Sequence, residues 1–253
     1  MKVQFLALTT IVISMVFASY RLVAETPKPM LYYDFEGKAG DTITDKSGNG
    51  KDGTLFNGAK RVDEGKFGKG VQFDGVDDFA VAPTKDVINE PGTGTVAIWV
   101  QAISTQGGGG FPVIFAHDAN MIHFGIQNGN WWVARGDENL DAKKDSGVRV
   151  KAKTWYHLTL TWDKRDANFY LDGDPVVKWA YPRRVLLRDL FFLGSSNGGE
   201  HFFSGTVDEL KIFKGTLTQA QVRDEMNESI KLAVFPAGKL AAIWGKIKIQ
   251  RHK

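Results

Sequence analysis

The stretch TWYHLTLTWDKRDANFYLDGDPV, residues 154–176, decides the fold class. It contains two segments rich in aromatic and β-branched residues, 154–163 and 167–176, and an Asp-Gly pair turns the second of them. Comparable segments recur along the chain at residues 30–37, 70–75, 78–83, 94–104, 121–136, 189–196 and 203–213. Short strands at this spacing, without helical segments between them, predict an all-β sandwich or barrel.

A single short helix is predicted after the last strand. Thr218 can cap it, and Gln221 follows three residues later, as in a capping box. We therefore expect a β domain over residues 30–228, followed by a basic tail over 229–253 whose role the sequence does not assign. This tail could lie on an anionic membrane or polymer surface, dock on the domain, or be disordered.

The first residues have the pattern of a secretory signal peptide. Lys2 precedes an apolar run, residues 3–17, which is shorter than the roughly 20 residues that a spanning helix needs. We predict a signal peptide over residues 1–24, and hence a secreted, cell-surface or periplasmic protein. An uncleaved membrane-anchored form is the alternative. The chain has no Cys, so an exported domain would depend on its core or on a bound ion for stability.

Composition limits the classes of function. The 253 residues suffice for one large domain or two small ones, and 43% of them are hydrophobic, so a sizeable core can form. The net charge of +3 is small for this length and argues against a nucleic-acid-binding protein, which would have a dense basic face.

Six segments in order carry a resemblance to a known family. They are LYYDFEG, TDKSGNGKDGTL, GKFGKGVQFDGVDDFAVAP, TWYHLTLTWD, NFYLDG and FSGTVDELKIFKGTLTQAQV. Over residues 30–228 the chain resembles secreted bacterial laminin-G-like (LamG) domains of the concanavalin A-like lectin/glucanase superfamily. The resemblance implies a two-sheet antiparallel jelly roll. It also implies a carbohydrate-binding or adhesive module, often with a structural calcium ion.

The segment TDKSGNGKDGTL, residues 44–55, looks in its first half like a calcium loop. Asp45, Ser47 and Asn49 alternate, and Gly50 follows. An EF-hand is excluded because its twelfth position, which requires Glu, is Phe56, and because the flanking segments are strands. A simple turn is the alternative, since Asp, Ser, Asn and Gly all favour turns.

The family resemblance supplies a partner for this loop, Asp208 in the last strand. Alternation places Asp208 on the same face as Leu210, where a carboxylate is costly to bury without a counter-ion. Asp34 raises the same problem in the first strand. We predict one structural calcium that joins the early loop to the last strand, unless Lys or Arg side chains or water neutralise these acids. The predicted ligands are Asp34, Asp45, Asn49 and Asp208.

The sequence does not predict an enzyme. Glucanases of this superfamily carry paired carboxylates on one strand, as Glu-x-Asp-x-x-Glu, because alternation then points both acids into the cleft. This spacing is absent from the chain. A divergent glycosidase with acids on separate strands is the less favoured alternative to a non-enzymatic binding module.

Tryptophans are the predicted sugar-binding residues. Trp131 and Trp132 are adjacent in a strand, so one faces the core and the other faces a groove or solvent. The same argument applies to Trp155, while Arg135 and Asn128 lie close to the tryptophan pair in sequence. We predict a glycan or cell-surface polymer as the partner, with a surface protein as the alternative. The aromatic residues could also simply pack the sandwich.

Overall fold

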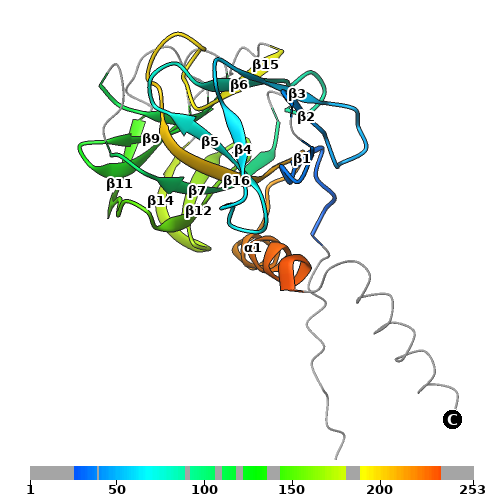
Figure 1. Ribbon diagram of the computed structural model, residues 1–253. Coiled ribbons are helices and arrows are strands. Elements are labelled where there is room, and N and C mark those ends of the chain that lie inside the picture. The colour runs from blue at the N-terminus through cyan, green and yellow to red at the C-terminus, as the bar shows by residue number, and fades with distance from the viewer. Residues whose placement is uncertain are drawn as a thin grey trace, which may run out of the picture.

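The computed structural model describes residues 26–38, 40–88, 92–105, 110–117, 122–135, 143–180 and 189–234. Within these ranges the chain forms two antiparallel eight-stranded sheets and one helix (Figure 1). No helix in these ranges is long and apolar enough to cross a membrane. The predicted signal peptide and the tail from residue 235 onward lie outside the described residues.

The first sheet contains both the first and the last strand of the described chain. Its order is β14 (Asp174–Ala180), β13 (Asp166–Leu171), β12 (Trp155–Trp162), β7 (Gly94–Ala102), β16 (Ser204–Phe213), β5 (Gly70–Asp74) and β4 (Lys60–Val62). β1 (Leu31–Tyr33) pairs with β16 beside this path.

The second sheet lies opposite the first. Its order is β11 (Lys143–Arg149), β10 (Asn130–Arg135), β9 (Ile122–Gln127), β8 (Val113–His117), β15 (Leu190–Leu193), β6 (Phe79–Pro83), β3 (Gly53–Phe56) and β2 (Thr42–Ile43). The predicted all-β, two-sheet jelly-roll architecture is confirmed.

The core lies between the two sheets and follows from strand alternation. In β12, Leu158, Leu160 and Trp162 belong to the main hydrophobic cluster, and the residues between them face away from it. Trp162 lies flat over Gly94, where an added Cβ would come within 2.1 Å of its ring. The packing of Trp162 against the neighbouring strand β7 therefore depends on a residue without a side chain at position 94.

A bulge interrupts β16 and changes the face on which Asp208 lies. Asp208 is opposite Trp99, but Lys211 is already opposite Ala97, so two residues of β16 face one residue of β7. Glu209 takes a positive φ of 51° at this point. The prediction that Asp208 shares a face with Leu210 was therefore wrong. Leu210 packs in the core, whereas Asp208 lies on the outer face.

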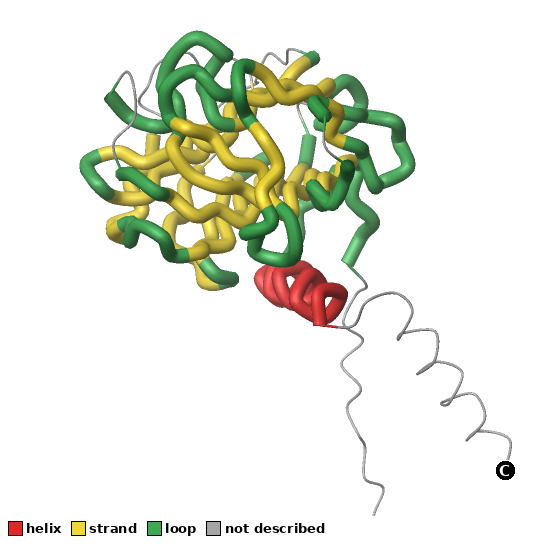
Figure 2. The backbone as a smooth tube through the Cα atoms, viewed as in Figure 1, coloured by secondary structure: helices red, strands yellow, loops and turns green. Residues whose placement is uncertain are grey.

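The predicted helix is α1 (Gln219–Val234; Figure 2). Its capping box is confirmed by two hydrogen bonds. The Thr218 N–H donates to Gln221 Oε1 at 3.0 Å, and the Gln221 N–H donates to Thr218 Oγ1 at 3.3 Å. A separate cluster of Tyr170, Phe213, Leu217 and Val222 packs the helix on the outer face of the first sheet. The opposite side of the sandwich, the outer face of the second sheet, does not carry this helix.

Candidate functional site

The outer face of the second sheet carries a row of aromatic side chains that we call the aromatic strip. It consists of Phe56, Phe79, Phe192, Trp132, Phe111 and His201. Three of its rings lie on adjacent strands. Phe56 and Phe79 pair across β3 and β6 and stack at 4.9 Å between ring centroids, and Phe192 lies 6.3 Å from Phe79. Phe56 is 40% exposed, so this end of the strip is open to solvent.

The other half of the strip is built on β10. Trp132 lies flat on the sheet because its neighbour on β9 is Gly125, where an added Cβ would come within 2.5 Å of the indole. Phe111 meets Trp132 edge-on at 5.6 Å, and His201 stacks on Phe111 at 3.9 Å. Phe111 and Phe192 pack against the same small cluster, so the two halves of the strip are continuous.

Polar side chains border the strip at β11. The Lys143 ammonium lies 3.9 Å from the centroid of Phe111 and 5.0 Å from that of Trp132, as in a cation–π contact. Burial lowers the pKa of Lys143. Beside it, Asn130 Nδ2 donates to Asp145 at 3.1 and 3.2 Å. Trp132 is only 1% exposed, so the groups that could meet a sugar at this end are the partly exposed Phe111, Lys143 and His201.

The structure separates the two predicted tryptophans as strand alternation requires. Trp131 is fully buried in the core, where it meets Tyr156 edge-on at 5.3 Å, and Trp132 lies on the opposite face. Trp132 is also covered, with only 1% of it exposed. Trp155 begins β12 in the other sheet, so it does not share a surface with Trp132.

The remaining predicted ligand residues lie at opposite ends of β10. Asn128 forms the β9–β10 turn with a φ of 52°, and its carbonyl accepts a hydrogen bond from Arg149 Nη1 at 3.1 Å. Arg135 ends the strand opposite Ile122, and its side chain lies outside the described residues. The predicted residues thus do not form one site. Among them, only Trp132 is part of the aromatic strip.

Sequence reasoning missed the phenylalanines that open the strip. Each of Phe56, Phe79 and Phe192 neighbours a core residue in its strand, so alternation does indicate that it faces outward. The signal was therefore present for each residue alone. That the three rings lie side by side depends on the strand order β3-β6-β15, which joins segments far apart in the chain.

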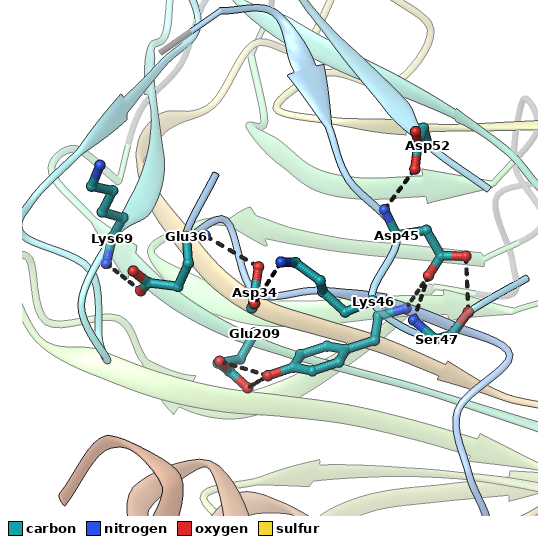
Figure 3. Close-up of polar contacts among 9 residues, drawn as sticks. Asp34, Glu36, Asp45, Lys46, Ser47, Asp52, Lys69 and Glu209 are labelled. Carbon is teal, nitrogen blue, oxygen red and sulfur yellow. Dashed lines mark hydrogen bonds and ion pairs between the residues drawn. The ribbon is translucent and has the colours of Figure 1, made fainter. Parts of the chain in front are cut away.

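Asp45 of the predicted calcium loop is saturated by protein donors (Figure 3). Its carboxylate accepts hydrogen bonds from the N–H groups of Tyr32, Ser47 and Lys51 and from the Ser47 hydroxyl, at 2.8–3.1 Å. Burial raises the pKa of Asp45, but these hydrogen bonds outweigh it and hold the pKa below its usual value. Protein donors thus already stabilise the Asp45 carboxylate.

Asn49 and Asp34 also have local partners. Asn49 Nδ2 donates to the Met30 carbonyl at 2.9 Å. Asp34 accepts a hydrogen bond from the Glu36 N–H and lies 3.7 Å from Lys46 Nζ (Figure 3). The alternatives to calcium were a turn with its own hydrogen bonds and neutralisation by a basic side chain. The geometry at Asp45 and Asn49 favours the turn, and the geometry at Asp34 favours the basic neighbour.

Asp208 differs from the other three predicted ligands. It is fully buried, and it accepts hydrogen bonds from the Phe67 and Glu209 N–H groups at 2.9 and 2.8 Å. No basic side chain among the described residues forms an ion pair with it. Burial, together with the charges of Glu209 and Glu36, raises the pKa of Asp208 to about 8.

The predicted carboxylates do not form a compact group. Within the described ranges, the acidic side chains whose oxygen atoms lie within 4.8 Å of one another in a group of three are Asp74, Asp77 and Asp78. These belong to the β5–β6 turn, where Asp74 accepts hydrogen bonds from the backbone N–H groups of Val76 and Asp77. Asp74 and Asp77 are therefore exposed turn residues, and Asp78 is buried beside them.

A model of the family described as the concanavalin A-like lectin/glucanases superfamily matches residues 74–223, more than half of the chain. A search of curated proteins found no match.

Solved structures with the same fold include several binding domains. Domain 4 of AbnA, a GH43 extracellular arabinanase from Geobacillus stearothermophilus solved with arabinotriose, has a TM-score of 0.64 and 23% identity over 79% of this chain and 99% of that domain. The binding domain of Paraclostridial Mosquitocidal Protein 1 has a TM-score of 0.63 and 16% identity, with coverages of 79% and 52%. The botulinum neurotoxin serotype D ligand-binding domain, solved with N-acetylneuraminic acid, has a TM-score of 0.62 and 13% identity, with coverages of 79% and 51%. This chain thus spans about half the length of the toxin domains.

Proposed function

The chain belongs to the concanavalin A-like lectin/glucanases superfamily, and from this premise we propose that it is a non-enzymatic module that binds carbohydrate through the aromatic strip. The observation that carries this proposal is the row of outward-facing rings on the second sheet, with Phe56 and Phe79 stacked at its open end. Sugar rings pack their C–H faces on aromatic rings, and bordering polar groups pair with the hydroxyls.

Two further observations support a binding role. Similar folds have been solved with arabinotriose in one case and with N-acetylneuraminic acid in another. The chain also lacks the paired-acid strand on which hydrolysis in this superfamily depends. A module that binds a surface protein is the second candidate, because the toxin neighbours are named as receptor-binding or ligand-binding domains.

The proposal predicts that Phe79→Ala weakens glycan binding by about tenfold or more, since a stacked ring contributes on the order of 1.5 kcal/mol. Retention should be measured by affinity electrophoresis in gels that contain plant, bacterial or animal polysaccharides. Ile103→Ala is the matched control, because Ile103 is 42% exposed but directly follows β7 in the first sheet. Equal retention of Phe79→Ala and the wild type would contradict a role for the strip.

We also propose that the protein is exported, on the basis of the apolar N-terminal segment. N-terminal sequencing of the mature protein, expected to begin after Ala18 or Ala24, tests this.

We propose that a structural calcium ion binds at Asp208. A fully buried carboxyl that forms no ion pair with a basic side chain among the described residues fits a site for a hard cation, and the charges of Glu209 and Glu36 act on the same carboxyl. A bound calcium ion would supply the positive charge that keeps Asp208 ionised. Asp45 is less suited to this role because its oxygen atoms already accept four hydrogen bonds.

This proposal predicts that calcium stabilises the wild type but not the Asp208→Asn variant. At a calcium concentration 100 times the dissociation constant, the gain would be about 2.7 kcal/mol. Melting temperatures should be compared in calcium and in chelator at the same ionic strength. The Asp45→Asn variant serves as a control and should keep the calcium-dependent shift even if its melting temperature is lower. A wild-type melting temperature that is identical in calcium and in chelator would refute the proposal.

A further inference from the structure

We propose that a small pocket at one edge of the sandwich binds a single sugar unit. The pocket has a volume of about 220 Å³, and its lining includes Asp41, Ala59, Lys60, Arg61, Asp63 and Lys69. Pockets for drug-sized ligands measure roughly 300–1,000 Å³, so this one suits a single sugar unit rather than a chain. The inference rests on the proposed carbohydrate-binding function, and it adds a second site, since none of these residues belongs to the aromatic strip.

The pocket forms where the edges of the two sheets meet. β4 ends the first sheet, and β2 ends the second. Arg61 of β4 lies opposite Val71 of β5, which is a core residue, so Arg61 continues the inner face of the first sheet at its edge. Arg61 Nη1 donates to the Gly40 carbonyl at 2.6 Å, and Nη2 donates to the Thr42 carbonyl. These hydrogen bonds join β4 to the start of β2.

The same hydrogen bonds fix Asp41 at the pocket. Asp41 lies between Gly40 and Thr42, whose carbonyls both accept from Arg61. Its own carbonyl accepts a hydrogen bond from the Leu55 N–H at 2.8 Å, while the residue itself is exposed. The backbone that carries this carboxylate is therefore already ordered, and less conformational entropy is lost when a ligand binds.

The charged side chains around the pocket do not pair with one another. Asp41 and Asp63 supply two carboxylates, and Lys60 and Lys69 supply two ammonium groups. None of these four side chains forms an ion pair within the part of the chain that the structure describes. The Lys69 N–H donates to Glu36 at 2.7 Å, but the Lys69 ammonium points away from Glu36 (Figure 3). Opposite charges thus surround an open space without neutralising each other by contact.

This arrangement favours sugar hydroxyls over other small ligands. A hydroxyl both donates and accepts hydrogen bonds, so neighbouring hydroxyls of one sugar can donate to a carboxylate and accept from an ammonium group. Sulfate only accepts hydrogen bonds, so it would leave Asp41 and Asp63 without partners. Ala59 is buried and belongs to the main core cluster, so it offers an apolar contact to the C–H groups of the sugar.

The test is the binding of free glucose, galactose, mannose, arabinose and xylose, measured by isothermal titration calorimetry. It is carried out in the Phe79→Ala variant, so that the aromatic strip contributes little. At least one sugar is expected to bind, and adding Asp63→Asn or Lys69→Ala should weaken its affinity about tenfold, as the loss of a hydrogen bond to a charged group does. Adding Lys178→Ala is the matched control, because Lys178 is an exposed lysine on β14, at the opposite edge of the first sheet.

The possible outcomes separate this inference from the proposed function. If no free sugar binds to Phe79→Ala while the wild type is retained on a polysaccharide, the pocket inference is refuted and the strip proposal stands. Equal affinities of the Asp63→Asn, Lys69→Ala and Lys178→Ala proteins would also refute the pocket. Tighter binding of sulfate or glycine than of any sugar, lost in Lys69→Ala, would refute the sugar assignment. No binding of the wild type to any free sugar or immobilised polysaccharide would overturn both proposals.

Discussion

Lys211→Ala is expected to lower the free energy of unfolding by about 3–5 kcal/mol, the typical effect of breaking a buried charge network. The Lys211 ammonium lies 2.9 Å from Glu225 Oε1 and 3.3 Å from Glu209 Oε2, and all three side chains are at least nine-tenths buried. Removing the ammonium would take away the positive charge that lies between these two buried carboxylates.

The network explains why this single change should have a large effect. Glu225 belongs to α1, and its other oxygen lies 3.0 Å from His157 Nε2 on β12. Tyr32 on β1 donates its hydroxyl to Glu209 at 3.0 and 3.1 Å (Figure 3). Burial raises the pKa of Glu225, but the charges of His157 and Lys211 outweigh it and lower the pKa to about 2. Lys211 thus joins the helix, the first strand and the last strand.

Urea unfolding at neutral pH, followed by tryptophan fluorescence, measures the effect. The matched control is Lys178→Ala, because Lys178 also pairs with a carboxylate, Asp166, at 2.8 Å but is 63% exposed. An exposed pair is worth about 0–1 kcal/mol, so this variant should unfold almost as the wild type does. Similar losses in both variants would contradict the network explanation.

Trp131→Ala is expected to cost about 3–5 kcal/mol of stability, as truncation of large core aromatics does. Trp131 is fully buried and packs edge-on against Tyr156 across the sandwich, so its loss would open a cavity that neighbouring strands cannot readily fill. The protein that remains folded should retain its glycan affinity, because Trp131 lies on the face opposite the aromatic strip.

Phe56→Ala provides the comparison, since Phe56 is 40% exposed and belongs to the strip. This variant should unfold close to the wild type but bind glycan more weakly. Denaturant unfolding and affinity electrophoresis of both variants separate the two roles. A Trp131→Ala protein with nearly unchanged stability and lost binding would show that Trp131 contacts the ligand.

Features that depend on neighbours in the chain could be predicted from the sequence. The capping box at Thr218 and Gln221 needs only a spacing of three residues, and it formed as predicted. The opposite orientations of Trp131 and Trp132 follow from the geometry of any strand. The two-sheet architecture follows in the same way from the repetition of short β-rich segments, because such segments can bury their apolar faces only against another sheet.

Features that depend on distant segments could not be predicted in this way. The bulge at Glu209 moves Asp208 to the outer face, and alternation alone cannot reveal an inserted residue. The hydrogen bonds that saturate Asp45 include one from Tyr32, thirteen residues away. The aromatic strip exists only because β3, β6 and β15 are neighbours in the sheet.

The sequence alone therefore establishes the fold class, the alternation of each strand and the local caps and turns, because these depend on spacing along the backbone. Only the tertiary structure shows which outward-facing rings meet and which buried charges find partners. The physical reason is that ring contacts and ion pairs act over a few ångströms in space, and strand order and register, rather than sequence separation, set those distances.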